Sequence, residues 1–183
     1  MPMEKTASNN ELIENCKAGD IKSQFILYKK YSGAMYNIAI RILNNKMDAE
    51  DILQESFLTA FERLDELKSE KALGSWLKRI VINNCISQVR KNKLHFEDID
   101  EDIHESTVDI PEIDSSIDPA FIHKAIKELP GGCRTVLVLF ALEQYRHREI
   151  AAMLGITEST SKTQYRRGLI LLNEKLKHKI YVN

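Results

Sequence analysis

The chain has 183 residues, of which 43% are hydrophobic, and a formal net charge of −1. This length and apolar content predict one or two domains with cores of their own. No apolar run approaches the ~20 residues of a membrane-spanning helix, and the N-terminus lacks the apolar centre of a signal peptide, so we expect a cytoplasmic protein without membrane insertion. The three cysteines are far apart and no Cys/His spacing is typical of zinc, so we expect no metal and no cofactor.

The small net charge conceals three blocks of different sign. Residues 1–93 carry 15 Lys/Arg and 12 Asp/Glu, residues 94–119 carry no Lys/Arg and ten Asp/Glu, and residues 120–183 carry 11 Lys/Arg and five Asp/Glu. Apolar residues recur at helical spacing in both basic blocks, and no convincing alternating strand occurs. We therefore predict an all-α protein in which two small helical domains, 1–93 and 120–183, are joined by a flexible acidic linker over 94–119.

Two helices are predicted early in the first block. The first runs from Glu11 to Lys17. Asp20 caps the second, in which Ile21, Phe25 and Tyr28 form an apolar stripe. The pattern continues to Leu43.

The strongest helix of the block begins at Asp48 and runs to Leu64, with acidic residues in its first turn, where the helix dipole favours them. Its apolar residues share one face. The outward face is left with Asp51, Gln54, Glu55 and Leu58. On composition alone, this face is most simply a solvated acidic surface.

A polar loop with Lys68 and Lys71 leads into the next helix, which Ser75 is expected to cap. This helix combines the only Trp of the chain with side-chain amides and basic residues: Trp76, Lys78, Arg79, Asn83, Asn84, Gln88, Arg90 and Lys91. Amides can hydrogen-bond base edges, cations neutralise phosphates and a flat ring can stack on a base, so the set suits opened or single-stranded DNA. Trp76 alone fits a core anchor better.

The last block predicts a helix over 120–129, a break at 130–132, a buried helix over 133–142, and then two helices separated by Gly155. A glycine suits the left-handed residue that ends a helix, and Thr157 is a good N-cap for the helix that follows. Ser161 and Tyr165 begin its inward stripe. The candidate DNA-contacting residues of this helix pair are Arg148, Thr157, Ser159, Thr160, Lys162, Thr163, Arg166 and Arg167. A helical hairpin with a solvated charged face is the alternative interpretation.

Taken together, these segments resemble the extracytoplasmic-function (ECF) branch of the bacterial sigma factors along nearly the whole chain. Residues 48–57 are similar to the branch's polymerase-binding helix, residues 76–83 to its −10-element helix, and residues 129–167 to its −35-binding domain. The resemblance implies a sigma region 2 helical bundle in 1–93 and a region 4 helix-turn-helix in 120–183. It also implies a protein that binds core RNA polymerase, recognises both promoter elements and promotes DNA melting.

The resemblance assigns roles to the candidate residues. The outward face of the helix that begins at Asp48 becomes the contact for the β′ clamp helices, with the β subunit as a further partner. The set from Lys68 to Lys91 becomes the −10 site, and the set from Arg148 to Arg167 becomes the −35 site. An anti-sigma factor is the expected restraining partner. The chain departs from the branch at Ser161, where many members carry an apolar residue, and after Arg167, where many carry further basic residues.

Two other classes of protein were weighed. A ligand-responsive helix-turn-helix regulator that binds operators as a dimer would use the same C-terminal helix pair. An enzyme is the weakest reading, because the five histidines are scattered and no nucleophile, metalloprotease or P-loop motif occurs. We therefore expect no catalytic residues.

Overall fold

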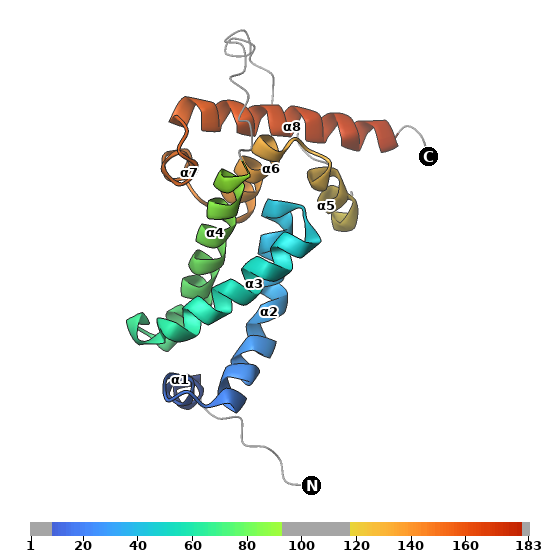
Figure 1. The fold of residues 1–183 in the computed structure, drawn as a ribbon. Coiled ribbons are helices and arrows are strands. Elements are labelled where there is room, and N and C mark those ends of the chain that lie inside the picture. The colour runs from blue at the N-terminus through green and yellow to red at the C-terminus, as the bar shows by residue number, and fades with distance from the viewer. Residues whose placement is uncertain (1–8, 93–117, 181–183) are drawn as a thin grey trace. The chain divides into compact units, whose positions relative to one another are not determined.

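The structure is a computed structural model that describes residues 9–92 and 118–180. Those residues are helical, with no strand among them, as the sequence predicts (Figure 1). The chain divides into two compact units, residues 1–40 with 45–85, and residues 41–44 with 86–183. The predicted acidic linker lies outside the described residues except for its last two positions, which belong to the start of a helix.

The first unit is built from α1 (Asn9–Lys17), most of α2 (Ile21–Leu43), α3 (Lys46–Glu62) and the part of α4 (Leu73–Lys91) up to residue 85, with two short 3-10 turns, Leu64–Glu66 and Glu70–Ala72, before α4. The C-terminal ends of α2 and α4 are grouped with the second unit. In Figure 1, α2, α3 and α4 form its body and α1 lies at one end. Its core consists mostly of aliphatic side chains, together with the Phe57 ring, Met35 and two cysteines. The largest contributors include Leu27, Leu53, Phe57, Leu77 and Val81.

Helix α3 begins at Lys46, two residues before the predicted start at Asp48. The side-chain oxygen of Asn45 accepts hydrogen bonds from the backbone N–H groups of Met47 at 2.9 Å and Asp48 at 3.3 Å. Asn45 is therefore the N-cap, and the predicted start was wrong because the side chain of Asn45, rather than that of Asp48, pairs the free N–H groups of the first turn.

Helix α4 also begins earlier than predicted, at Leu73. Ser75 lies inside the helix, and its hydroxyl donates to the carbonyl oxygen of Ala72 at 2.9 Å. The expected cap at Ser75 was wrong, because a serine side chain can bond back to a preceding carbonyl within a helix as readily as it caps one.

Of the apolar stripe predicted at the start of α2, only Tyr28 reaches the core, where its ring lies 4.7 Å from that of the buried Phe57 between centroids. Ile21 is 79% exposed and Phe25 is 56% exposed, and the neighbouring Ile26 is 54% exposed. Helix α2 instead buries Leu27 on its other side, and the ammonium group of Lys29 lies 5.1 Å above the Phe25 ring. The start of α2 therefore carries more apolar surface than the other helices of the unit cover. The prediction at Asp20 was correct, since its carboxylate accepts from the backbone N–H of Ser23 at 2.9 Å.

The second unit contains α5 (Pro119–Lys127), α6 (Gly131–Leu137), a π-helical turn (Val138–Leu142), α7 (His147–Leu154) and α8 (Glu158–Ile180). The long helix α8 packs on α5, α6 and α7 (Figure 1). The predicted buried helix is thus α6 followed by the π-helical turn.

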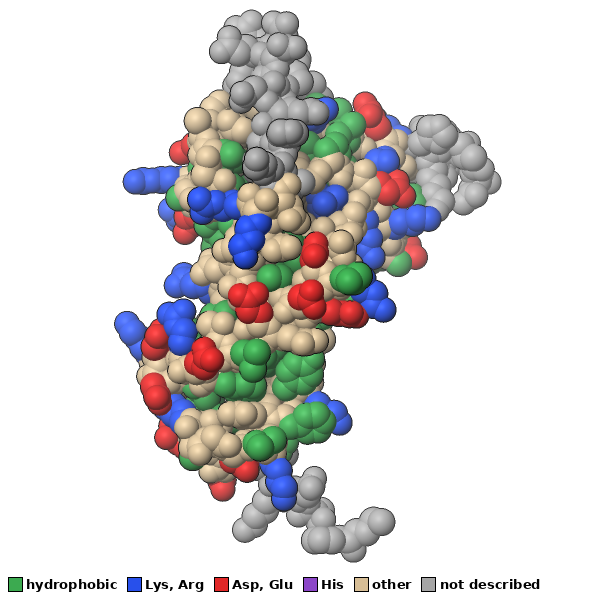
Figure 2. All heavy atoms as spheres, in the orientation of Figure 1, with side chains coloured by type: hydrophobic (Ala, Val, Ile, Leu, Met, Phe, Trp, Pro, Cys, Tyr) green, Lys and Arg blue, Asp and Glu red, His purple; other side chains and the backbone are tan. Residues whose placement is uncertain are grey.

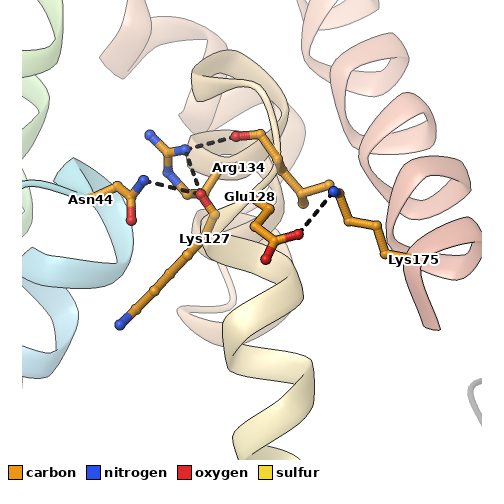
Figure 3. A network of polar contacts seen from close by, with 6 residues as sticks. Asn44, Lys127, Glu128, Arg134 and Lys175 are labelled. Carbon is orange, nitrogen blue, oxygen red and sulfur yellow. Dashed lines mark hydrogen bonds and ion pairs between the residues drawn. The ribbon is translucent and has the colours of Figure 1, made fainter. Parts of the chain in front are cut away.

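Arg134 holds the corner between α5 and α6. Its side chain is buried, and Nη1 donates to the carbonyl oxygens of Leu129 at 2.8 Å and Lys127 at 3.4 Å, where α5 ends (Figure 3). Loss of solvent around the guanidinium lowers the pKa of Arg134. An ion pair of 3.0 Å between Lys175 and Glu128 joins α8 to the same corner. The carbonyl groups that a helix end leaves unpaired are therefore used to fix the next helix.

Gly168 explains how closely α8 approaches α6. A Cβ atom at this position would lie 3.4 Å from the carbonyl oxygen of Cys133 and 3.4 Å from a methyl carbon of Leu137. The chain therefore carries a glycine, rather than a basic residue, at a point where α8 packs against α6.

Candidate functional site

The outward face of α3 is exposed as predicted. Its four residues, Asp51, Gln54, Glu55 and Leu58, are all exposed, and Leu58 is 65% exposed. The residues between them, such as Leu53 and Ser56, are buried, so one side of α3 packs and the other is free of the unit's own core. Figure 2 shows acidic and exposed hydrophobic side chains side by side on the face that carries α3. This combination suits a partner helix with basic and apolar residues.

Helix α4 presents four polar side chains on successive turns. Arg79, Asn83, Ser87 and Arg90 are spaced by four, four and three residues, which places them on one side of a helix, and all four are exposed. We call these four residues the α4 strip. The two arginines at the ends of the strip can contact phosphates, and the amide and hydroxyl between them can hydrogen-bond base edges of the same strand. Ser87 was not among the predicted residues, although it follows Asn83 by four positions and so lies on the same side of the helix.

The other predicted residues of α4 lie off this strip. Asn84 is half-buried, and its side-chain amide donates to the hydroxyl of the fully buried Ser56 at 3.0 Å. Trp76, Lys78 and Gln88 are half-buried as well. Two adjacent asparagines thus have different surroundings, which their types alone did not reveal.

The segment before α4 carries the two predicted loop lysines. Lys68 and Lys71 are both exposed. Arg63 braces the start of the segment, since its Nε and Nη2 donate to the two carboxylate oxygens of Glu66 at 2.9 and 2.7 Å. The two lysines are therefore held near the N-terminus of α4 on short turns, with their charges in solvent.

The turn between α7 and α8 has the predicted geometry. Gly155 has a φ of +71°, and its N–H donates to the carbonyl oxygen of Ala151 at 2.9 Å. Thr157 caps α8, since its hydroxyl accepts from the backbone N–H of Thr160 at 3.0 Å. The Thr160 hydroxyl lies 2.8 Å from that of Thr157, so both side chains are engaged in the cap. These contacts confirm a helix-turn-helix.

The outward face of α8 is polar over its first turns. Ser159 and Lys162 are exposed, and Thr163 and Arg166 are half-exposed. The ammonium group of Lys162 lies 2.7 Å from a carboxylate oxygen of Glu158, a pairing that lowers the pKa of this carboxyl. Arg148 on α7 and Arg167 on α8 are exposed and half-exposed, respectively. The arrangement offers hydroxyls near the N-terminus of α8 and cations on both helices, as a recognition helix needs.

The inward side of the same helix pair holds a polar contact that the sequence did not reveal. Ser161 is fully buried, and its hydroxyl lies 3.0 Å from Nδ1 of His147 at the start of α7. The imidazole stacks on Phe140 with ring centroids 4.2 Å apart. Burial lowers the pKa of His147, and the positive charge of Lys162 lowers it further. The negative charge of Glu158 acts in the opposite direction. Fourteen residues separate His147 and Ser161, so no periodic pattern links them.

Residues 9–92 and 118–180 contain no group of three His, Cys, Asp or Glu side chains placed to hold a metal ion. No helix in these two ranges is long and apolar enough to cross a membrane. The three cysteines are buried and unbridged, as expected for small core residues, and burial raises the pKa of Cys16 to about 11 and that of Cys85 to about 12.

Comparisons with known proteins match both units. Family models for sigma-70 region 2 and sigma-70 region 4 match residues 27–95 and 122–172. The chain is 30% identical over 143 residues to the RNA polymerase sigma-E factor of Streptomyces avermitilis, which covers 78% of this chain and 79% of that protein. It is 28% identical over 161 residues to the ECF RNA polymerase sigma factor SigM of Mycobacterium tuberculosis, covering 88% and 81%. A crystal structure of the sigma factor RpoE with the anti-sigma factor NepR, from Bartonella quintana, matches with a TM-score of 0.51 and 26% identity over 86% of this chain and 98% of RpoE.

Proposed function

The chain belongs to the ECF group of bacterial RNA polymerase sigma factors, and from this premise we propose which surfaces carry each step of promoter-specific initiation. The protein binds core RNA polymerase, recognises −10 and −35 elements and promotes DNA melting. The observation that carries the assignment is that one chain presents two DNA-suited helices, α4 and α8, together with the acidic and apolar face of α3. A dimeric operator-binding regulator needs only the α7–α8 pair.

The proposed division follows the charge blocks. Residues 1–93 act as region 2, residues 94–119 as the acidic linker and residues 120–183 as region 4. In region 2, the α3 face of Asp51, Gln54, Glu55 and Leu58 binds the β′ clamp helices of polymerase. This face supplies carboxylates and an exposed leucine, which is the chemistry that a basic, partly apolar helix requires.

The −10 element is proposed to bind at α4 and at the segment before it. Arg79 and Arg90, at the two ends of the α4 strip, meet phosphates, and Asn83 meets a base edge. Lys68 and Lys71 support the strand beside a flipped base, because extruding a base costs about a few kcal/mol that protein contacts must offset. The half-buried Trp76, Lys78 and Gln88 contribute from the edges of this surface, and Lys91 adds a cation at the helix end.

The two adjacent asparagines of α4 provide a matched test of the −10 assignment. Asn83→Ala is expected to reduce promoter opening about tenfold, with a smaller loss of thermal stability than Asn84→Ala, because Asn83 lies on the exposed strip. Asn84→Ala is expected to destabilise the first unit by about 1–2 kcal/mol, because it removes the donor to the buried Ser56 hydroxyl. Permanganate footprinting of the opened strand and thermal unfolding measure the two effects. Equal promoter defects in both variants would contradict the assignment to the strip.

The −35 element is proposed to bind at the α7–α8 pair. Arg148 and Lys162 position the pair on phosphates, Ser159, Thr163 and Arg166 lie nearest base edges, and Thr157 and Thr160 hold the end of α8 that enters the groove. Arg167 is half-exposed and adds a cation beside the same face.

A pair of single substitutions on α8 separates base contact from phosphate contact. Arg166→Ala is expected to cost about 1–3 kcal/mol at one −35 base pair, with only a modest loss of general affinity. Lys162→Ala is the control, and is expected to weaken binding uniformly and to lower the salt slope by about one. Affinities of the polymerase holoenzyme for promoters with single −35 substitutions provide the measurement. Uniform weakening by Arg166→Ala would show that Arg166 contacts phosphate alone.

The protein is proposed to have no chemistry of its own and to act in the cytoplasm, where polymerase works. The related RpoE was crystallised with an anti-sigma factor, and we propose that a partner of this class restrains the present chain by covering its polymerase- or DNA-binding faces.

The overall assignment is tested by run-off transcription with purified bacterial core polymerase. The expected result is initiation at discrete start sites that depends on the added chain. A chain that binds duplex operators as a dimer, and gives no start sites with polymerase, would instead establish the regulator.

A further inference from the structure

The partly buried contact between α7 and α8 is held on several sides. The Ser161 hydroxyl lies 3.0 Å from His147 Nδ1. The imidazole is parallel to the Phe140 ring within 15°, and the Tyr165 ring meets it nearly edge-on at 5.6 Å. Phe140 and Tyr165 also contact each other at 4.6 Å between centroids. Thus the ring of His147 has little room to move, and its hydrogen bond to α8 has a defined direction.

Apolar side chains would be sufficient to pack α7 against α8, so a hydrogen-bonded polar pair between these helices requires another explanation. A buried hydroxyl without a partner costs free energy, and a partnered one contributes only modestly to stability. A hydrogen bond differs from an apolar contact in restricting both distance and angle. The hydrogen bond between His147 and Ser161 therefore restricts the orientation of α8 relative to α7.

We propose that the His147–Ser161 hydrogen bond is the positioning contact that sets the orientation of α8 relative to α7 and so aims the −35-reading residues. The proposal rests on the proposed function, in which α8 reads the −35 element. Ser161 is flanked on α8 by Ser159, Lys162 and Thr163, so a rotation of the helix that breaks the bond also displaces the residues facing DNA. His147 and Ser161 touch no base themselves.

The contact is compatible with a neutral imidazole in either tautomer, since the hydroxyl can donate to a bare Nδ1 or accept from a protonated one. The charged groups that act on the ring are Lys162, which disfavours the imidazolium, and Glu158, which favours it; Tyr165 and Phe140 are neutral neighbours. Because the pKa of His147 is lowered from 6.5 in the folded chain, its contribution to stability is present above pH 6.5 and is lost as the pH falls below it.

Two substitutions of His147 separate the hydrogen bond from the ring stack. His147→Asn places an amide near the position of Nδ1 and can keep the bond to Ser161 while losing the stack. His147→Phe keeps a ring on Phe140 but has no atom to bond Ser161. Ser161→Ala removes the bond from the other side. None of the three changes a residue that is proposed to contact DNA.

The experiment measures the polymerase holoenzyme's affinity for a −35 sequence selected from a random pool, divided by its affinity for a scrambled −35. Ser161→Ala and His147→Phe are expected to lower this ratio about tenfold, and His147→Asn to keep it within about threefold.

Three results would overturn the proposal. The first is an unchanged ratio in folded Ser161→Ala. The second is equal weakening on selected and scrambled DNA with a lower melting temperature, which is the behaviour of a packing contact alone. The third is a wild-type affinity ratio in His147→Phe together with a lowered ratio in His147→Asn, which would assign the effect to the ring stack. Failure of the wild-type holoenzyme to discriminate at −35 is distinguishable from these, and would refute the proposed role of α8 and this proposal with it.

Discussion

Replacing Gln54 and Glu55 together with alanine is expected to lower the affinity of the chain for core RNA polymerase about 100-fold. Both side chains are exposed on α3, next to the 65%-exposed Leu58, so their loss leaves the fold intact and removes contacts from the centre of the proposed interface. Side chains at the centre of an interface commonly cost about 1–2 kcal/mol each, and two such losses correspond to roughly this factor. Specific run-off transcription should fall with binding.

The control for this variant removes the same chemistry from another helix. Glu14 and Asn15 are exposed on α1, so Glu14→Ala/Asn15→Ala also deletes one carboxylate and one amide. This variant is expected to bind polymerase within about twofold of wild type. Binding is measured by equilibrium titration of labelled chain with purified core enzyme, and folding by circular dichroism. Wild-type affinity in the α3 variant would show that polymerase binds elsewhere on the chain.

The elements that the sequence predicted best are those in which local chemistry decides the structure. Gly155 adopts the left-handed conformation and Thr157 caps α8, because both depend on contacts within four residues. The outward faces of α3 and α8 were also predicted correctly, since helical periodicity directly separates buried from exposed positions. Periodicity failed at Ile21 and Phe25, because it identifies an apolar face without showing whether another element covers it.

The features that could not be predicted are contacts between residues far apart in the chain. Asn84 was grouped with Asn83 by residue type, and only the packing of α3 on α4 reveals its bond to Ser56. In the sequence, Arg134 is simply one basic residue within a predicted buried helix, and only the structure shows that it fixes the end of α5. In each case the sequence supplied the side chain, and a second helix determined its role.

The second large effect is expected at Gly168. A leucine there should destabilise the second unit by about 2–3 kcal/mol, because its Cβ alone would already be in contact with the Cys133 carbonyl oxygen and a Leu137 methyl carbon, both at 3.4 Å, and the atoms beyond Cβ have to displace their neighbours. Helix α8 would have to move away from α6, and the −35 face that it carries would move with it. Hydrogen exchange of the α6 and α8 amides should become roughly 30- to 100-fold faster, and −35 discrimination should fall.

The matched control is Gly33→Leu in α2. Gly33 also lies within a helix, but a Cβ added to it would meet nothing within 4 Å, so only helix propensity changes. A leucine at this position should stabilise α2 by about 0.5–1 kcal/mol, because glycine is a poor helix former. Opposite signs at the two glycines would show that Gly168 is required by packing and Gly33 is not. If Gly168→Leu leaves exchange and −35 discrimination unchanged, the approach of α8 to α6 is not what positions the recognition helix, and the turn at Gly155 and the His147–Ser161 bond must do so alone.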